Sequence, residues 1–291
     1  MISPMAVFFQ LLANGLVAAA LYGISAIGFG LVIRTGKFFN LAHGAFAVIG
    51  AYTAFAFVRL GLPFGWTVLL SLTAAVISGA LSYALVILPL RRRSASSLVL
   101  LIATLGVFTF VPPMLAIAFG SEYYLLHIPL FFSRVVSLAG AAVTLWQITF
   151  MLIFVLLIVG TALFLRYTAF GKAVRAVSDD EEVSKIIGIN TDRVVFVVIL
   201  FAAFTAGLAG LFKAGDLGLE PTMGFTLLLE TLIVAVVGGM YRLGGTVMGA
   251  LVLGLAESFG VWFVPNEWKE AISFGILILF LLIRPQGILS R

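Results

Sequence analysis

The sequence predicts an all-α integral membrane protein, a polytopic bundle of about nine (eight to ten) transmembrane helices that forms one domain over residues 1–291. Composition, the length of the apolar segments and the placement of basic residues all point to this class. Of the 291 residues, 63% are hydrophobic and only 10% are charged. A soluble domain carries about 25% charged residues to cover its surface. We therefore expect lipid to cover most of this chain.

The apolar segments are long and continuous. A helix needs about 20 apolar residues to cross the hydrocarbon core of a bilayer. Transmembrane β-strands alternate apolar and polar residues, and the segments found here do not alternate, so helices are predicted. The segments 41–58 and 225–240 are short and rich in glycine, and either could be a re-entrant or broken helix. All predicted spans, in chain order, are 8–33, 41–58, 64–88, 95–119, 144–165, 194–213, 225–240, 244–264 and 268–283.

Basic residues predict the orientation of the bundle, because cytoplasmic loops carry an excess of Lys and Arg. If the N-terminus lies outside and each segment crosses once, the exterior side keeps Arg59, Arg134, Lys213 and Lys269. The other basic residues then lie on the cytoplasmic side: Arg34, Lys37, Arg91, Arg92, Arg93, Arg166, Lys172, Arg175, Lys185, Arg193, Arg242, Arg284 and Arg291. This asymmetry predicts an N-out, C-in arrangement.

One cytoplasmic loop of substance, residues 166–193, is predicted to contain a short capped helix over 179–187. Ser178 and Glu181 have the spacing of a capping box. Gly188 suits the left-handed position that follows a helix. Such a helix is too short to be stable alone in water, so it must lie on the lipid headgroups, on its own bundle or on a partner protein.

Several chemistries are excluded or disfavoured by the residues present. Cysteine is absent, so disulfides and thiolate sites are impossible. The two histidines, His43 and His127, lie far apart in the predicted topology, and no metal site is expected. No G-x-x-x-x-G-K-[ST] phosphate loop occurs, so the chain should not bind ATP by that motif. With no convergent cluster of His, Asp or Glu, we predict neither an enzyme nor a bound cofactor.

Four polar residues inside or beside the predicted spans are candidates for function. An intramembrane charge costs several kcal/mol unless it is paired or hydrated, which singles out Glu230 and Glu257. Glu230 either reaches the membrane interface or lines a path, and Glu257 either packs inside the bundle or lines a path. His43 and Asn40 form either a capping cluster at the start of a helix or part of a path. An ion-coupled secondary transporter would use such carboxylates.

Three stretches of the chain resemble one known family. They are Asn14-Gly15 through Phe39-Asn40-Leu41-Ala42-His43-Gly44, then Gly171-Lys172-Ala173-Val174-Arg175 with Gly188-Ile189-Asn190, and finally Pro221-Thr222-Met223-Gly224 through Arg284-Pro285-Gln286-Gly287. Together they resemble the LivH-type permease subunit of the branched-chain (hydrophobic) amino-acid ABC importers. One departure is Ala45-Phe46, where members of the family often carry an acidic residue after His-Gly.

The resemblance implies a multi-pass permease of a bacterial or archaeal cytoplasmic (inner) membrane, with two related halves of opposite topology. It implies a LivM-like permease subunit, two cytoplasmic ABC ATPases that use the ATP, an extracytoplasmic substrate-binding protein and no nucleic acid. The implied cargo is branched-chain or other small hydrophobic amino acids, or alternatively urea, amides or another small solute. Candidate residues of the translocation path are Asn14, Asn40, His43, Gly44, Glu230 and Glu257. Candidate ATPase-coupling residues, in the loop 166–193, are Gly171, Lys172, Arg175, Glu181, Gly188, Ile189 and Asn190.

Overall fold

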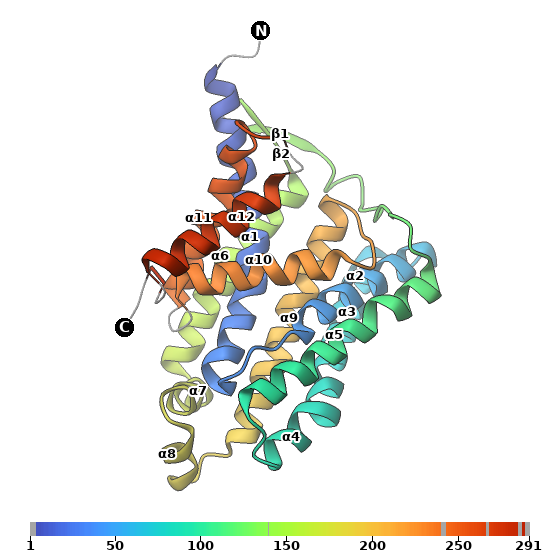
Figure 1. Cartoon of the computed structure of the whole chain (residues 1–291). Coiled ribbons are helices and arrows are strands. Elements are labelled where there is room, and N and C mark those ends of the chain that lie inside the picture. Colours follow the sequence, from blue (N-terminus) through green and yellow to red (C-terminus); the bar gives the residue numbers. More distant parts are fainter. Residues whose placement is uncertain (1–3, 139, 240–242, 266–267, 285–286, 289–291) are drawn as a thin grey trace.

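The structure, a computed structural model, describes residues 4–138, 140–239, 243–265, 268–284 and 287–288 (Figure 1). Every predicted apolar segment forms a helix. In chain order these are α1 (Pro4–Gly36), α2 (Ala42–Arg59), α3 (Phe64–Ser82), which a π-helical turn (Tyr83–Ile87) joins to α4 (Leu88–Arg92), α5 (Ser97–Phe119), α6 (Leu145–Tyr167), α7 (Ala169–Asp179), α8 (Glu181–Ile186), α9 (Thr191–Asp216), α10 (Met223–Gly238), α11 (Leu243–Gly260) and α12 (Lys269–Ile283).

The predicted class, an all-α membrane protein, is confirmed. Seven of the described helical segments are long and apolar enough to cross a bilayer, and α10 is a shorter apolar helix. Its 16 residues rise about 24 Å, less than the hydrocarbon core of about 30 Å, and Figure 1 shows it strongly inclined to α1. The short segment 225–240 therefore differs from the long spans, as its glycine content suggested.

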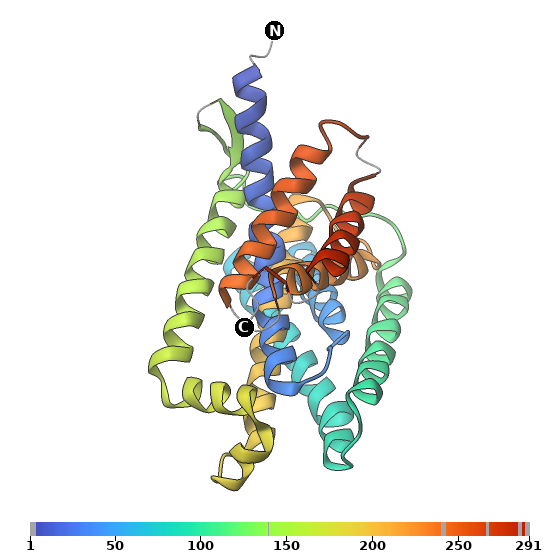
Figure 2. The same ribbon diagram turned by 60° about the vertical axis from the view of Figure 1, so that its left-hand side comes forward.

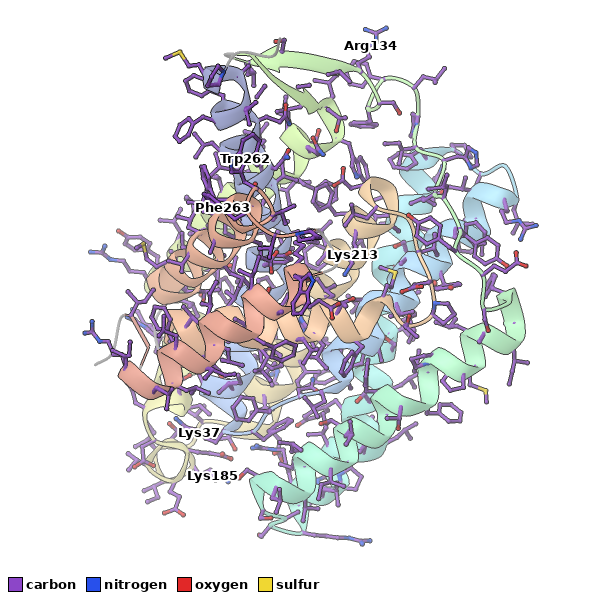
Figure 3. The ribbon with its side chains drawn as sticks, turned by 45° about the horizontal axis from the view of Figure 1, so that its top comes forward. Lys37, Arg134, Lys185, Lys213, Trp262 and Phe263 are labelled. Atoms are coloured by element: carbon purple, nitrogen blue, oxygen red, sulfur yellow. The ribbon has the colours of Figure 1, made fainter. Side chains whose placement is uncertain are left out.

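A small β-hairpin interrupts the helical pattern on the side predicted to be external. Strands β1 (Val135–Leu138) and β2 (Ala141–Thr144) pair antiparallel, with Val135 opposite Thr144. The hairpin directly precedes α6, whose first turn is capped by the side chain of Thr144. Figure 3 places Arg134, next to this hairpin, on the opposite side of the molecule from Lys37 and Lys185, as the predicted orientation requires.

Helices α1 and α9 form the centre of the bundle and run in opposite directions (Figure 1). Helix α1 packs against α10 and α11, while α9 packs against α2 and α3. Each central helix leads through a short loop into the next helix, α1 into α2 and α9 into α10. Each central helix thus packs against the two helices that follow the other central helix, and the two central helices run in opposite directions. This arrangement agrees with two halves of opposite topology. Helices α5 and α6 bury few residues and form the periphery.

The predicted capping box at Ser178 is wrong. Helix α7 continues through Ser178, whose hydroxyl lies 3.2 Å from that of Thr35 on α1. The cap of α8 is instead Asp180, whose carboxylate accepts from the amides of Glu182 (2.9 Å) and Val183 (3.0 Å). The amphipathic stretch before Ser178 packs on the bundle and extends the helix, so the break in the backbone falls two residues later. The short helix therefore begins at Glu181 and not at Asp179.

Candidate functional site

Two cavities lie among α1, α9, α10, α11 and α12. The larger, of about 470 Å³, has both charged and apolar walls, and the smaller has a volume of about 250 Å³. Four residues line both: Lys213, Leu217, Glu230 and Lys269. The structure thus brings together two lysines and a carboxylate that the sequence placed in three separate segments.

Glu257 is fully paired inside the bundle. The Tyr22 hydroxyl donates to its Oε2 at 2.5 Å, and Lys269 Nζ lies 3.2 Å from the same oxygen. The Ser273 hydroxyl donates to its Oε1. Its side chain is 2% exposed, whereas that of Lys269 is 36% exposed. These contacts join α1, α11 and α12, so a charge that would be costly alone in the membrane connects three helices here.

Glu230 differs from Glu257 because one of its oxygens accepts no hydrogen bond within the described residues. Lys213 Nζ lies 3.9 Å from Glu230 Oε2, and this oxygen has no hydrogen-bond partner among the described residues. Lys213 donates instead to the Thr226 hydroxyl at 3.1 Å. The side chain of Glu230 is 17% exposed and lines both cavities. The side chain therefore faces cavities within the protein, as the path interpretation expects.

Asn14 also lines the smaller cavity, together with Glu230. Its side-chain oxygen accepts from Gln10 at 2.9 Å. Of the six predicted path residues, Asn14, Glu230 and Glu257 therefore lie around these cavities.

His43 and Asn40 lie elsewhere, at the junction of α1, α2 and α10. His43 Nε2 is 3.0 Å from the Ser25 hydroxyl, which lies 2.7 Å from the Thr231 hydroxyl. Both side-chain polar atoms of Asn40 are buried without a hydrogen-bond partner in the described part of the chain. The capping interpretation is wrong, because α2 begins after Leu41 with no side-chain cap. His43, Ser25 and Thr231 instead form a buried polar junction, and Thr231 directly follows Glu230 in α10.

Gly44 allows α2 and α10 to touch. A Cβ atom at Gly44 would lie 2.6 Å from the carbonyl oxygen of Gly224, and a Cβ at Gly224 would lie 2.6 Å from that of Gly44. Both residues occur in the first turn of their helices, one in each half. The two halves therefore meet backbone to backbone at this reciprocal contact, where any side chain would be too large.

The loop 166–193 is held to the bundle by an ion-pair network around Glu181. Its carboxylate lies 2.7 Å from Arg91 Nη2 on α4 and 2.9 Å from Lys185 Nζ, and accepts from the Thr191 hydroxyl at 3.2 Å. Burial alone would raise the pKa of Glu181, but the hydrogen bond from Lys185 and the Arg91 guanidinium outweigh it and lower this pKa. The network therefore stabilises the loop above the unfolded pKa of a Glu and weakens as the pH falls through the lowered folded pKa.

The remaining coupling candidates divide into residues that shape the loop and residues that are exposed. Gly188 has a φ of +88°, as its predicted left-handed position requires, and Asn190 caps α9 by accepting from the amide of Arg193 at 3.0 Å. Ile189 packs against the core, and Gly171 sits against α6, where a Cβ would lie 2.6 Å from the Leu165 Cα. Among the coupling candidates, Lys172 and Arg175 have exposed side chains, and the loop also exposes the apolar residues Val183, Ile186 and Ile187.

Replacing Arg91 with Gln should loosen α8. The change removes a charge-assisted hydrogen bond to Glu181 worth about 1.5 kcal/mol. We expect the backbone amides of α8 to exchange roughly tenfold faster in hydrogen–deuterium exchange. Arg92→Gln, at the exposed neighbouring position, is the control and should leave the exchange rate unchanged. Equal rates in the two variants would contradict the assigned network.

Several residues of these sites have no signal in the sequence. Ser25, Thr231 and Ser273 are neutral residues in apolar helices, and Tyr22 resembles any other buried aromatic residue. Lys213 and Lys269 are visible as charges at the ends of predicted spans, but nothing local shows that they turn inward to Glu230 and Glu257. In the sequence Arg91, like these two lysines, serves only as a marker of orientation, and nothing local predicts its ion pair with Glu181.

Comparison with known proteins gives consistent matches over nearly the whole chain. A family model described as "Branched-chain amino acid transport system / permease component" matches residues 11–281. The chain is 31% identical to the high-affinity branched-chain amino acid transport system permease protein LivH of Escherichia coli (strain K12), over 98% of this chain and 96% of that protein. It is 30% identical to the permease protein BraD of Pseudomonas aeruginosa, with the same two coverages.

A solved structure shares the fold. PsaBC from Streptococcus pneumoniae in complex with Fab matches with a TM-score of 0.53 and 15% sequence identity, over 96% of this chain and 93% of the matched chain. At this identity the likeness concerns the arrangement of the helices alone.

Proposed function

This chain belongs to the family of permease components of branched-chain amino acid transport systems, and on that premise we propose that it is the membrane subunit of an ATP-driven importer of branched-chain or other small hydrophobic amino acids. Its membership makes it a multi-pass membrane permease of an ABC transporter. The ATP would be bound and hydrolysed by two separate cytoplasmic ATPases. A LivM-like second permease and an extracytoplasmic substrate-binding protein complete the proposed assembly.

One observation carries the coupling part of this proposal. Helix α8 exposes Val183 (52%) and Ile186 (83%), and its C-cap residue Ile187 is 66% exposed, although all three are large and apolar. The Arg91–Glu181 ion pair and the Asp180 cap fix the helix that carries them. A fixed helix with an exposed apolar face is typical of a docking surface. We assign the ATPase contact to this face and to the exposed Lys172 and Arg175 on α7. In this assignment Gly171, Glu181, Gly188, Ile189 and Asn190 hold the shape of the loop.

The cavities around Glu230 support the proposed path. An amino acid carries an ammonium group, a carboxylate and an apolar side chain. The larger cavity offers carboxylates and lysines together with apolar walls from Leu229, Ile233 and Phe274. Glu230 Oε2 accepts no hydrogen bond within the described residues and has only the distant Lys213 ammonium, at 3.9 Å, beside it, whereas Glu257 is occupied by its own partners. In this proposal Asn14, Glu230 and Glu257 line the path, and Asn40, His43 and Gly44 form the junction that adjusts when the two halves move.

The same geometry weighs against an ion-coupled carrier. Glu257 accepts from Tyr22 and Ser273 and is paired with Lys269, so its charge is already balanced. The test is uptake into proteoliposomes. With both permeases, the ATPases and the loaded binding protein, branched-chain amino acid uptake should require ATP. Uptake by this chain alone, driven by a proton gradient, would overturn the proposal. ATP-dependent uptake of only urea or an amide would overturn the assigned cargo and leave the mechanism standing.

Replacing Ile186 and Ile187 together with Ser should uncouple the transporter. Both positions are exposed, so the permease itself should fold normally. Hot-spot residues at the centre of an interface contribute about 2 kcal/mol or more on truncation, and this face places two large apolar residues there. We therefore expect substrate-stimulated ATPase activity and uptake to fall at least tenfold, roughly as this energy predicts.

The matched control is Leu60→Ser, a change of the same kind at a position that is 72% exposed. Leu60 lies in the turn between α2 and α3 on the predicted external side, where it should leave activity unchanged. Full activity of the Ile186→Ser/Ile187→Ser variant would show that the ATPases dock elsewhere.

A further inference from the structure

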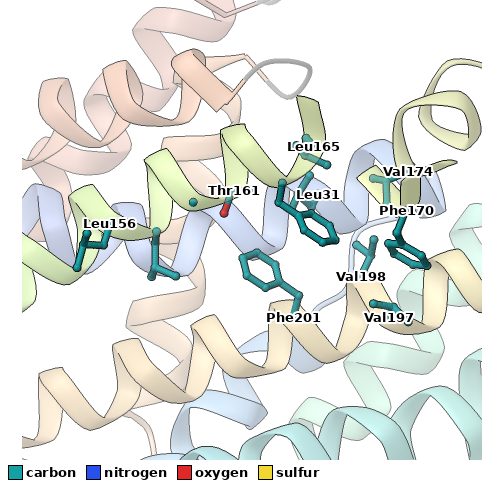
Figure 4. A pocket seen from close by; sticks show the side chains of 12 residues that line it. Leu31, Leu156, Thr161, Leu165, Phe170, Val174, Val197, Val198 and Phe201 are labelled. Carbon is teal, nitrogen blue, oxygen red and sulfur yellow. The ribbon is translucent and has the colours of Figure 1, made fainter. Parts of the chain in front are cut away.

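An apolar groove that the proposed function does not use runs along α6. It has a volume of about 300 Å³ and is lined by side chains of α1, α6, α7 and α9. In Figure 4, Leu156, Thr161 and Leu165 of α6 face Phe201 and Val198 of α9 across it, with Phe170 and Val174 of α7 at one end. Figures 1 and 2 show α7 turned across the foot of α6. The groove is therefore closed at its foot by α7 and is flanked by a peripheral helix.

The dimensions of the groove fit one leaflet of a bilayer. Along α6 it extends from Leu156, the middle residue of that helix, to Leu165 near its end. Nine residues of helix rise about 14 Å, and half of the hydrocarbon core measures about 15 Å. The groove thus spans one leaflet from the midplane to the interface. In the predicted orientation this is the cytoplasmic leaflet.

Three basic residues follow or precede, in the sequence, residues that line the interfacial end of the groove. Arg166 directly follows Leu165, Lys172 lies two residues after Phe170, and Arg193 lies one helical turn before Val197. All three are exposed, and no ion pair joins them to a carboxylate within the described residues. Basic residues beside a membrane attract anionic lipid headgroups, and each raises the affinity by a factor of about five.

We propose that this groove binds one phospholipid of the cytoplasmic leaflet, with an acyl chain along α6 and an anionic headgroup at Arg166, Lys172 and Arg193. A groove left empty would lose the dispersion contacts of its walls. An acyl chain restores them, and its length matches the groove. The basic residues at the foot select an anionic headgroup. A transmembrane helix of another protein would gain nothing from these charges.

Photo-crosslinking tests the proposal on the purified permease complex in nanodiscs. The probes are phosphatidylglycerol and phosphatidylcholine, each with a diazirine on one acyl chain. We expect peptides of α6 and α9 that line the groove to be labelled at least fivefold more by phosphatidylglycerol than by phosphatidylcholine. Labelling spread evenly over α5 and α6, or equal labelling by the two probes, would overturn the proposal.

Two matched pairs of variants separate groove binding from general contact with lipid. Gly160 lines the groove, and a Cβ there meets no atom within 4 Å, as at Gly106 on α5 outside the groove. Gly160→Leu should fill the groove and reduce labelling at least fivefold, whereas Gly106→Leu should not. Arg166→Gln/Lys172→Gln should abolish the preference for phosphatidylglycerol, and Arg92→Gln/Arg93→Gln should retain it.

A protein occupant would give a different result. With a photoreactive amino acid in place of Leu156, a lipid-filled groove should yield no crosslink to the second permease. A crosslink to that subunit from this position would show that a helix covers the groove, and would overturn the proposal. Elution of each variant as a single species in size-exclusion chromatography verifies that it is folded.

Discussion

Lys269→Met is expected to destabilise the permease by about 3 kcal/mol, because it leaves the buried carboxylate of Glu257 without a compensating cation, although Lys269 itself is 36% exposed. Glu257 would remain 1% exposed, with hydrogen bonds from Tyr22 and Ser273 but no cation. The measurement is the thermal midpoint of unfolding in detergent micelles, followed by size-exclusion chromatography after heating. A loss of this size should lower the midpoint by several degrees.

Two further variants identify the cause. The double variant Glu257→Gln/Lys269→Met removes both charges and should recover most of the lost stability. Lys185→Met removes the cation of an exposed pair with Glu181, since Lys185 is 58% exposed, and should cost no more than about 1 kcal/mol. If the double variant is no more stable than Lys269→Met alone, Lys269 does not stabilise the fold by compensating the charge of Glu257.

Gly44→Ala should have the second large effect, on both stability and uptake. The added Cβ would lie 2.6 Å from the carbonyl oxygen of Gly224 and 2.8 Å from the Phe108 ring. Because the nearest atom belongs to a backbone, it cannot rotate away, and overpacking of this kind costs about 1–3 kcal/mol or more. We expect α2 and α10 to separate, with a lower thermal midpoint and a loss of ATP-dependent uptake of at least tenfold.

The same substitution elsewhere provides the control. Gly106 lies in a helix with open space around it, so Gly106→Ala should leave both quantities unchanged or slightly raise stability through helix propensity. Phe108→Ala in the Gly44→Ala background should fail to restore uptake, since it relieves only the contact with the ring. Recovery by Phe108→Ala would show that the ring, and not the meeting of the two backbones, limits this position.

The candidate site was only partly accessible from the sequence. Glu230 and Glu257 stand out because charges are rare in apolar segments, and both line the larger cavity. Their different states depend on residues far along the chain: Tyr22 reaches Glu257 across 235 positions. His43 and Asn40 stood out as polar residues at the start of a helix, but the structure separates them from the cavities. Local spacing assigned the cap of α8 to Ser178. It cannot reveal that Ser178 lies within α7, where its hydroxyl contacts Thr35 of α1.

By itself the sequence determined that this chain is a helical membrane protein with an identifiable cytoplasmic loop, and its motifs pointed to the permease family. These properties follow from local chemistry, since apolar backbone in lipid must satisfy its own hydrogen bonds within helices and basic residues report the cytoplasmic side. Only the tertiary structure decided which charges are paired, where the two halves touch at Gly44 and Gly224, and where a groove remains beside α6. Each of these features depends on helices that are distant in the sequence and lie within a few ångströms of each other. The residue pattern of a single segment does not predict which other segments it will contact.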